Sequence, residues 1–219
     1  LIFLSGERAS FFFNTLGAIY IILMIKDFKK IRLFSFVISL VVIVFLSFYD
    51  GSAKQRIVDE TVNQMGLTSD KKHIFSEVHE SHYLSAYKMF LDNKILGIGV
   101  RNFRNYCNQD QYKVAERSCT THPHNTYVQL LSETGLIGFI FGILVLIYFI
   151  HISLKHLFGV IIKKKYYFND FEVCMLAAIL ISIWPFVPTG NFLNNWVAII
   201  YYFPVGFLLW SLKKREVIK

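Results

Sequence analysis

Charge is scarce in this sequence, and acidic charge is the scarcer kind. Only 17% of the residues are charged, with 15 Asp and Glu against 23 Lys and Arg, whereas soluble domains carry about 25%. Apolar residues make up 54% of the chain, with 22 Phe and 12 Tyr among them. A soluble domain rarely combines so many aromatic residues with so little charge, so the composition indicates a membrane protein with several spans.

The sequence also lacks Pro-rich or Gly/Ser-rich stretches, a repeat of solenoid type, a signal peptide and an initiator Met. Without a repeat, a solenoid is excluded. Without low-complexity composition, the polar residues 51–126 are not expected to form a flexible linker. Because Leu1 lies inside an apolar run, we expect the chain to be the C-terminal part of a longer protein. The positive charge lies mostly between apolar runs, where membrane orientation explains it without a nucleic-acid partner.

Five apolar segments have the length and the flanking residues of transmembrane helices. They are residues 9–25, 33–48, 135–154, 173–187 and 193–212. Clusters of Lys and Arg follow the first, third and fifth segments, and such clusters mark cytoplasmic ends. All three clusters then fall on one side of the membrane, and the long loop 51–126 falls on the other. The sequence therefore predicts an all-α membrane protein with about five transmembrane helices and one long extracytoplasmic loop.

The loop and its junction with the third span contain three predicted local structures. Residues 76–91 carry apolar side chains at approximate helical spacing, which predicts an amphipathic helix able to pack onto the membrane face. Residues 95–99 predict an apolar turn whose glycines permit close approach of backbone. Residues 128–135 are expected to extend the third span outside the membrane, either as a continuous helix or as a short helix joined at Gly135.

Two of the three cysteines, Cys107 and Cys119, lie in the loop. Because the extracytoplasmic compartment of bacteria is oxidising, a disulfide between them is chemically reasonable. In the chain-entropy model, closing so short a loop would stabilise the fold by about 3 kcal/mol. The alternative is a pair of free thiols. Cys174, at the start of the fourth span, is interpreted as a small buried apolar residue.

Two pairs of histidines have spacings that also occur in zinc sites. His79 and His82 form an H-x-x-H pair, and His122 and His124 form an H-x-H pair. Neither spacing is specific, and no clear fourth-ligand pattern accompanies them, so we predict no metal and no cofactor. His73 and His79 are expected on the solvated surface.

His124 stands in the sequence His-Pro-His-Asn, directly before a predicted helix. Pro123 restricts the backbone, and the Asn125 side chain is suited to cap the helix that follows. A neutral imidazole near the bilayer surface, with guanidinium groups nearby, can act as a base near neutral pH. A purely structural histidine is equally compatible with the pattern.

Four segments together resemble the O-antigen ligase and polymerase superfamily, and they occur in the family's order. They are SGERAS at 5–10, LDNKILGIGVRNFRNYC at 91–107, HPHNTYVQLLSETGLIG at 122–138 and PTGNFLNNW at 188–196. The resemblance covers essentially the whole chain, residues 1–219. It implies the C-terminal part of a polytopic glycosyltransferase of the GT-C type in the bacterial inner membrane.

The resemblance further implies an enzyme of lipopolysaccharide biosynthesis in the cell envelope. Such enzymes move a glycan from undecaprenyl pyrophosphate to a sugar hydroxyl on the periplasmic side and need no metal. The acceptor is lipid A–core for a ligase and another repeat unit for a polymerase, and the motifs leave the two open. The implied partners are the lipid-linked donor, the acceptor and the bilayer. From other classes, the alternatives are a transporter segment and a non-catalytic membrane protein.

The resemblance also assigns roles to histidine and acidic positions. His124 matches the family histidine, which implies the general base that activates the acceptor hydroxyl, and His122 would support it. Glu133 matches a family acidic position and would either orient the histidine or hold the junction between helix and loop.

Three arginines are the implied pyrophosphate ligands. Arg8 matches a family arginine at the start of a span, and Arg101 or Arg104 matches a second one, with Arg104 the slightly better match. Arginine suits this role because its planar guanidinium offers several donors to phosphate oxygens and neutralises charge as the glycosidic bond breaks.

Overall fold

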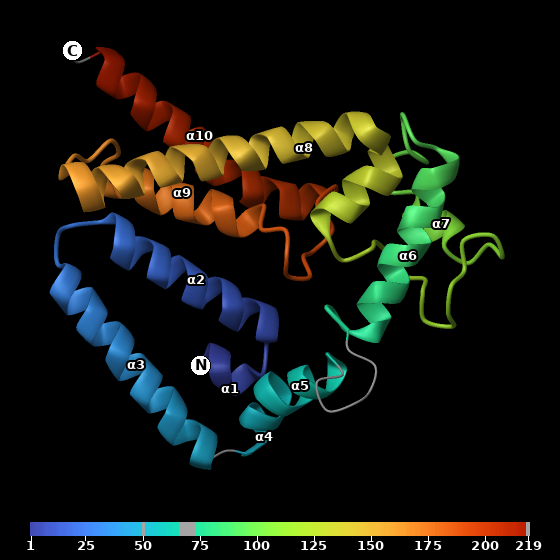
Figure 1. Ribbon diagram of the computed structural model, residues 1–219, viewed down its shortest axis with the longest axis horizontal. Coiled ribbons are helices and arrows are strands. Elements are labelled where there is room, and N and C mark those ends of the chain that lie inside the picture. Colours follow the sequence, from blue (N-terminus) through green and yellow to red (C-terminus); the bar gives the residue numbers. More distant parts are fainter. Residues whose placement is uncertain (50, 66–72, 218–219) are drawn as a thin grey trace. The chain divides into compact units, whose positions relative to one another are not determined.

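The computed structural model describes residues 1–49, 51–65 and 73–217. Within them every regular element is a helix and no strand occurs, so the predicted all-α class is confirmed (Figure 1). Residues 66–72 of the predicted loop lie outside the described part. The chain divides into two compact units. The first comprises Leu1–Thr61, Phe149–Ser182 and Tyr201–Lys219, and the second comprises Val62–Tyr148 and Ile183–Ile200.

Three helices in the described residues are long and apolar enough to cross a membrane. They are α3 (Lys29–Tyr49), α8 (Thr126–Phe158) with the π-helix that continues it to Lys163, and α10 (Asn195–Val217) up to Arg215. The predicted spans 33–48 and 135–154 lie inside the first two of these helices, and the predicted span 193–212 overlaps α10 but begins two residues before it. Three of the five expected spans therefore have helices of sufficient length.

The other two predicted spans correspond to shorter helices. Residues 9–25 fall on α2 (Arg8–Met24), which has 17 residues, and residues 173–187 fall on α9 (Asp170–Ser182), which has 13. The predicted end of the latter span is wrong. The helix stops at Ser182 because Pro185 disfavours helical backbone in the residue before it. At 1.5 Å per residue, α9 extends about 20 Å, less than the hydrocarbon thickness of about 30 Å. The count of five spans stays a prediction.

Polar groups hold the first unit together where its helices end. His156 is fully buried; its Nε2 donates to the carbonyl of Met24, and its Nδ1 accepts from the backbone amides of Tyr167 and Phe168. The buried carboxylate of Glu172 accepts a hydrogen bond from Ser211 and pairs with Arg215. The short elements of this unit are α1 (Ile2–Ser5), α4 (Gly51–Lys54), a π-helix (Gln55–Asp59) and α5 (Glu60–Gln64), whose last residues belong to the second unit.

The second unit is built on α6 (Glu77–Asp92), the short α7 (Phe103–Tyr106) and the N-terminal part of α8. The helix predicted over 76–91 is confirmed by α6, and the Ser76 side chain caps it by accepting from the backbone N–H of His79. The hydrophobic core of the second unit contains a cluster of buried residues, namely Ala86, Met89, Phe103, Cys107 and Tyr112. Cys107 and Cys119 are joined by a disulfide, with their Cα atoms 4.9 Å apart.

A bend at Gly135 divides α8 into two helical parts (Figure 1). Around this bend, hydrogen bonds connect α8 to the loop that follows α6. Gly135 has φ 64° and ψ −161°, so of the two expected forms the structure has the short helix joined at this residue. The bend releases backbone groups that the loop then satisfies. The Ile98 N–H donates to the backbone carbonyl of Ser132 at 2.9 Å, and the Gly99 N–H donates to that of Glu133 at 3.0 Å. The Leu136 N–H donates to the backbone carbonyl of Lys94 at 2.8 Å.

Both glycines at this junction are required by close contact of backbone with backbone. A Cβ on Gly97 would collide with the backbone of Glu133 and its neighbours, and a Cβ on Gly135 would collide with the carbonyl of Ile95. Both residues also have φ between 60° and 70°, a region that side chains disfavour. The predicted close approach at residues 95–99 is thus confirmed, and it fixes the loop to α8.

Candidate active site

Three histidines from two segments of the chain gather around His124 in the second unit. His79 and His82 come from α6, and His122 and His124 come from the segment before α8. The ring of His124 lies 4.2 Å from that of His122 and 5.5 Å from those of His79 and His82, measured between centroids. These four residues are called the histidine cluster below. The expectation that His79 lies on solvated surface is wrong, because α6 packs this half-buried residue against His124.

Backbone and capping contacts hold His124 at the start of α8. His124 has φ 57°, and its carbonyl accepts from the Thr189 N–H at 2.8 Å. The predicted cap is present: the side-chain oxygen of Asn125 accepts from the N–H groups of Tyr127 and Val128. Its amide nitrogen donates to the carbonyl of Pro185 at 2.8 Å. These hydrogen bonds therefore restrain the backbone from which the His124 imidazole projects.

A polar face on α8 ties the same position to the turn 188–196. Gln129 donates to the side-chain oxygen of Asn191 at 2.7 Å and accepts from the N–H of Phe192 at 3.1 Å. Gln129 and Asn191 are both buried, and sequence reasoning assigned neither to the site. The available signal was spacing, since Asn125, Gln129 and Glu133 recur every four residues on an otherwise apolar helix.

Hydrogen bonds define the tautomers of two of the histidines. The Nε2 atom of His122 faces the Thr189 carbonyl at 3.3 Å, and that of His82 faces the Arg117 carbonyl at 2.9 Å. Because a carbonyl oxygen only accepts, Nε2 carries the hydrogen in both neutral rings. The Nδ1 atom of His122 then accepts from the Thr121 hydroxyl at 2.9 Å. The buried Nδ1 of His82 has no hydrogen-bond partner among the described residues.

Burial and crowding keep His82, His122 and His124 neutral near pH 7. Burial, followed by the neighbouring rings of His122, His79 and His82, lowers the pKa of His124 to about 4. Burial is also the main cause that lowers the pKa of His82 and of His122, and the nearby charge of Arg104 adds to the effect on His122. A neutral imidazole at the centre of the cluster has a lone pair available to take a proton.

Glu133 holds the loop that carries the predicted arginines. Its carboxylate is 1% exposed and accepts from the backbone N–H groups of Arg101 and Phe103, each at 3.0 Å. It also accepts from the side chain of Gln129 at 3.0 Å. Of the two roles expected for Glu133, these contacts match the second, holding the junction between helix and loop.

The three predicted arginines differ in their surroundings. Arg101 and Arg104 have exposed side chains, and Arg104 is the one whose charge acts on His122. Arg8 belongs to the first unit, where it begins α2 and donates from Nη1 to the Thr61 hydroxyl at 3.4 Å.

The described residues contain no group of three or more His, Cys, Asp or Glu side chains arranged to hold a metal ion. The four rings of the histidine cluster pack against one another, with centroids of contacting rings 4.2 to 6.0 Å apart.

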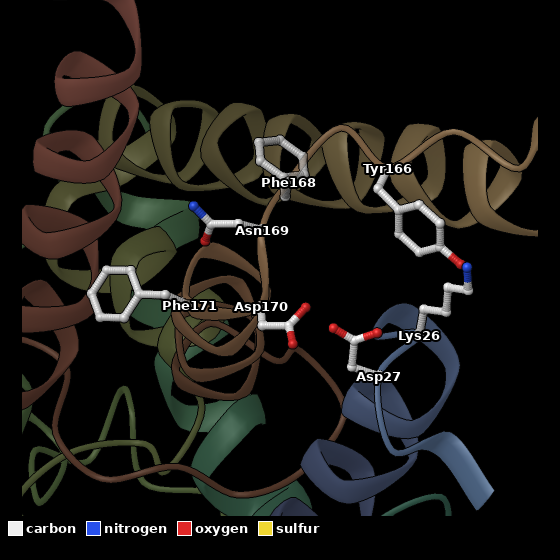
Figure 2. A pocket seen from close by; sticks show the side chains of 7 residues that line it. All are labelled: Lys26, Asp27, Tyr166, Phe168, Asn169, Asp170 and Phe171. Carbon is white, nitrogen blue, oxygen red and sulfur yellow. The ribbon is translucent and has the colours of Figure 1, made fainter. Parts of the chain in front are cut away.

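A cavity of about 580 Å³ lies elsewhere, in the first unit (Figure 2). It is lined by Lys26, Asp27, Tyr166, Phe168, Asn169, Asp170 and Phe171. In Figure 2 the carboxylates of Asp27 and Asp170 point toward each other, and the amine of Lys26 points toward the hydroxyl of Tyr166. None of the predicted site residues lines this cavity.

A family model described as O-antigen ligase matches residues 1–143, which is more than half of the 219 residues. The chain belongs to the O-antigen ligase family. No curated protein and no solved structure matches it. The matched region contains the histidine cluster, the three arginines and Glu133. Membership in the O-antigen ligase family, together with the long apolar helices, indicates a membrane enzyme of the ligase or polymerase kind that acts on lipid-linked glycans.

Proposed function

We propose that this chain acts as an O-antigen ligase at the periplasmic side of the inner membrane. It moves a glycan from undecaprenyl pyrophosphate to a sugar hydroxyl of lipid A–core. The observation that carries the proposal is the position of His124, a neutral imidazole at the centre of the histidine cluster, directly before the Asn125 cap of α8.

In the proposed reaction His124 takes the proton of the acceptor hydroxyl. The acceptor oxygen attacks the anomeric carbon of the donor as the bond from that carbon to the pyrophosphate oxygen breaks. The electron pair of that bond leaves with the pyrophosphate, and the configuration at the anomeric carbon inverts. His124 has a pKa of about 4 without donor. A pyrophosphate brought beside it would raise that value, because an anion favours the imidazolium form. Donor binding thus strengthens the base.

The arginines would bind the leaving group. Arg104 is the better candidate of the loop pair, since its charge is felt at His122, the direct neighbour of His124. Arg8, which belongs to the first unit, is proposed as a further pyrophosphate ligand on the family motif alone. Glu133 contributes indirectly: it fixes the backbone of Arg101 and Phe103 onto α8, the helix that begins just after His124. One buried carboxylate therefore links the cationic loop to the base.

A polymerase of the same family is the second candidate, because it would use the same donor and the same base. It differs only in the acceptor, which is another repeat unit. A transporter is disfavoured because the residues suited to chemistry lie in the loop and in the first turns of α8, whereas transporter sites lie near the middle of membrane spans.

Replacement of His124 tests the proposal in cells that depend on the full-length protein for surface glycan. His124→Ala is compared with His151→Ala, which removes an exposed histidine from α8 far along the helix. We expect His124→Ala to lose surface glycan on gels and His151→Ala to keep it. Mass spectrometry of the lipid fraction then separates the two candidates: undecaprenyl-linked polymer accumulates for a ligase, and single repeat units accumulate for a polymerase. Normal surface glycan in His124→Ala would contradict the proposed base.

A further inference from the structure

The second unit exposes an apolar strip that its own helices do not cover. On α6, the exposed residues Leu84, Tyr87 and Leu91 are spaced three and four apart and therefore share one face. The loop that follows adds Ile95 and Leu96, which are 66% and 72% exposed. These five residues are called the apolar strip. Exposed hydrophobic residues scattered singly are ordinary, but a continuous strip on an extramembrane helix and its loop marks an interaction surface.

The apolar strip is tied to the point where α8 turns from polar to apolar. Before Gly135, α8 buries polar residues such as Gln129 and Glu133; after it, the helix exposes apolar ones, among them Ile137 and Phe141. The hydrogen bond from the Leu136 N–H to the Lys94 carbonyl places the start of the loop directly beside this transition. The contact of Gly97 with the backbone around Gly135 fixes it there.

We propose that the apolar strip lies in the bilayer, at the boundary between headgroups and acyl chains of the leaflet next to the histidine cluster. α8 is one of the helices able to cross a membrane, and the strip begins where its apolar part begins. Ile95 and Leu96 must then share the depth at which α8 enters the lipid. Lys88 and Lys94, both exposed, flank the strip. Lysines beside a shallow apolar surface suit a layer of anionic headgroups.

The proposal gives the histidine cluster a fixed depth. His79 and His82 are carried by the same helix as Leu84, Tyr87 and Leu91. Insertion of the strip therefore holds the cluster close to the headgroups. In combination with the proposed function, on which this consequence rests, the base would stand at the level of a pyrophosphate attached to a lipid.

Spin labels measure this depth directly. Leu96→Cys is labelled in the full-length protein with Cys174→Ala, which removes the free thiol, in nanodiscs of phosphatidylethanolamine and phosphatidylglycerol. Mass spectrometry checks that the disulfide between Cys107 and Cys119 is intact. Ile140→Cys, on the exposed apolar part of α8, is the reference inside lipid. Val114→Cys is the matched control in the same unit, since Val114 is exposed among the charged residues Lys113, Glu116 and Arg117.

Power saturation compares collisions of each label with oxygen, which partitions into lipid, and with a water-soluble nickel chelate. We expect the ratio of oxygen to nickel accessibility at Leu96 to exceed that at Val114 at least threefold and to approach that at Ile140. A ratio at Leu96 equal to that at Val114 overturns the proposal. Low accessibility to both reagents also overturns it, because it indicates cover by protein, including a second copy of this chain. Ile95→Cys gives the same test if Leu96→Cys does not fold. The readout needs no glycan transfer, so it succeeds or fails independently of the proposed function.

Discussion

Glu133 is a single residue on which the geometry of the site depends. Its buried carboxylate accepts from two backbone N–H groups of the loop and from Gln129. Glu133→Gln removes the charge and replaces one acceptor oxygen with a donor, which leaves at least one buried N–H without a partner. We expect a loss of about 1–3 kcal/mol in the free energy of unfolding, measured as a lower Tm of the purified protein in detergent.

The matched control for this change is Glu116→Gln, because Glu116 is exposed. Surface substitutions of this kind change stability by less than about 0.5 kcal/mol. Equal Tm values for Glu133→Gln and Glu116→Gln would contradict the role assigned to Glu133.

The histidine cluster predicts a dependence of stability on pH. The pKa of His124 is about 4 in the folded protein against 6.5 for an ordinary histidine, so the unfolded chain binds more protons between these values. The stabilisation is fully present above about pH 6.5 and is lost as the pH falls toward about 4. Thermal unfolding measured from pH 7.5 to pH 4 is expected to show a falling Tm.

Carboxylates titrate near the lower end of this range, so the decisive quantity is the difference between two proteins. In His124→Gln no group at this position can be protonated. The Tm of this variant is therefore expected to fall less between pH 6.5 and pH 4.5 than the Tm of the unchanged protein. Identical pH profiles would contradict the lowered pKa of His124.

Sequence reasoning reached those site residues whose signal is local. Asn125 caps the helix that its position predicted, and Cys107 and Cys119 lie close together on either side of a short loop. The gathering of His79 and His82 around His124 was not predictable, because it depends on how α6 packs against a segment about forty residues later. The hydrogen bond between Gln129 and Asn191 depends on contacts of still longer range.

At the scale of elements, the junction between the loop and α8 depends on two glycines. Gly97→Ala and Gly135→Ala each place a Cβ against backbone that cannot move aside, at a positive φ. The left-handed conformation costs a side chain about 1–2 kcal/mol and overpacking adds about 1–3 kcal/mol. We expect either variant to lower the Tm strongly or to prevent folding, as measured by size-exclusion chromatography and thermal unfolding.

Gly206→Ala provides the comparison, since a Cβ at Gly206 in α10 meets no atom within 4 Å. Alanine in a helix is favoured over glycine by about 0.5–1 kcal/mol, so this variant should be as stable as the unchanged protein or more stable. If Gly97→Ala and Gly135→Ala behaved like Gly206→Ala, the close contact between loop and helix would be wrong.

Helices with a clear apolar pattern were predictable, but their ends were less so. α6 follows from the spacing of its apolar residues, whereas the sequence left open whether α8 continues through Gly135 or bends there. The end of α9 at Ser182 was misjudged because apolar residues continue beyond the helix. Composition shows how long an apolar run is, whereas the backbone limit set by Pro185 determines where the helix stops.

At the scale of the whole molecule, family membership and the histidine cluster support one account. The match to the O-antigen ligase family covers residues 1–143. The remaining residues include the turn whose Thr189 and Asn191 contact the residues around the base. The central claim is that His124 accepts the proton of the acceptor during glycan transfer.

The most direct test is the rate of transfer by the purified full-length protein in nanodiscs, with undecaprenyl-pyrophosphate-linked glycan as donor and lipid A–core as acceptor. His124→Gln is compared with His151→Gln and with the unchanged protein, and donor affinity is measured separately. The account predicts that His124→Gln lowers kcat by about 10²–10⁴-fold while donor affinity stays nearly constant, and that His151→Gln keeps full activity. A His124→Gln protein with a kcat close to that of the unchanged protein would contradict it.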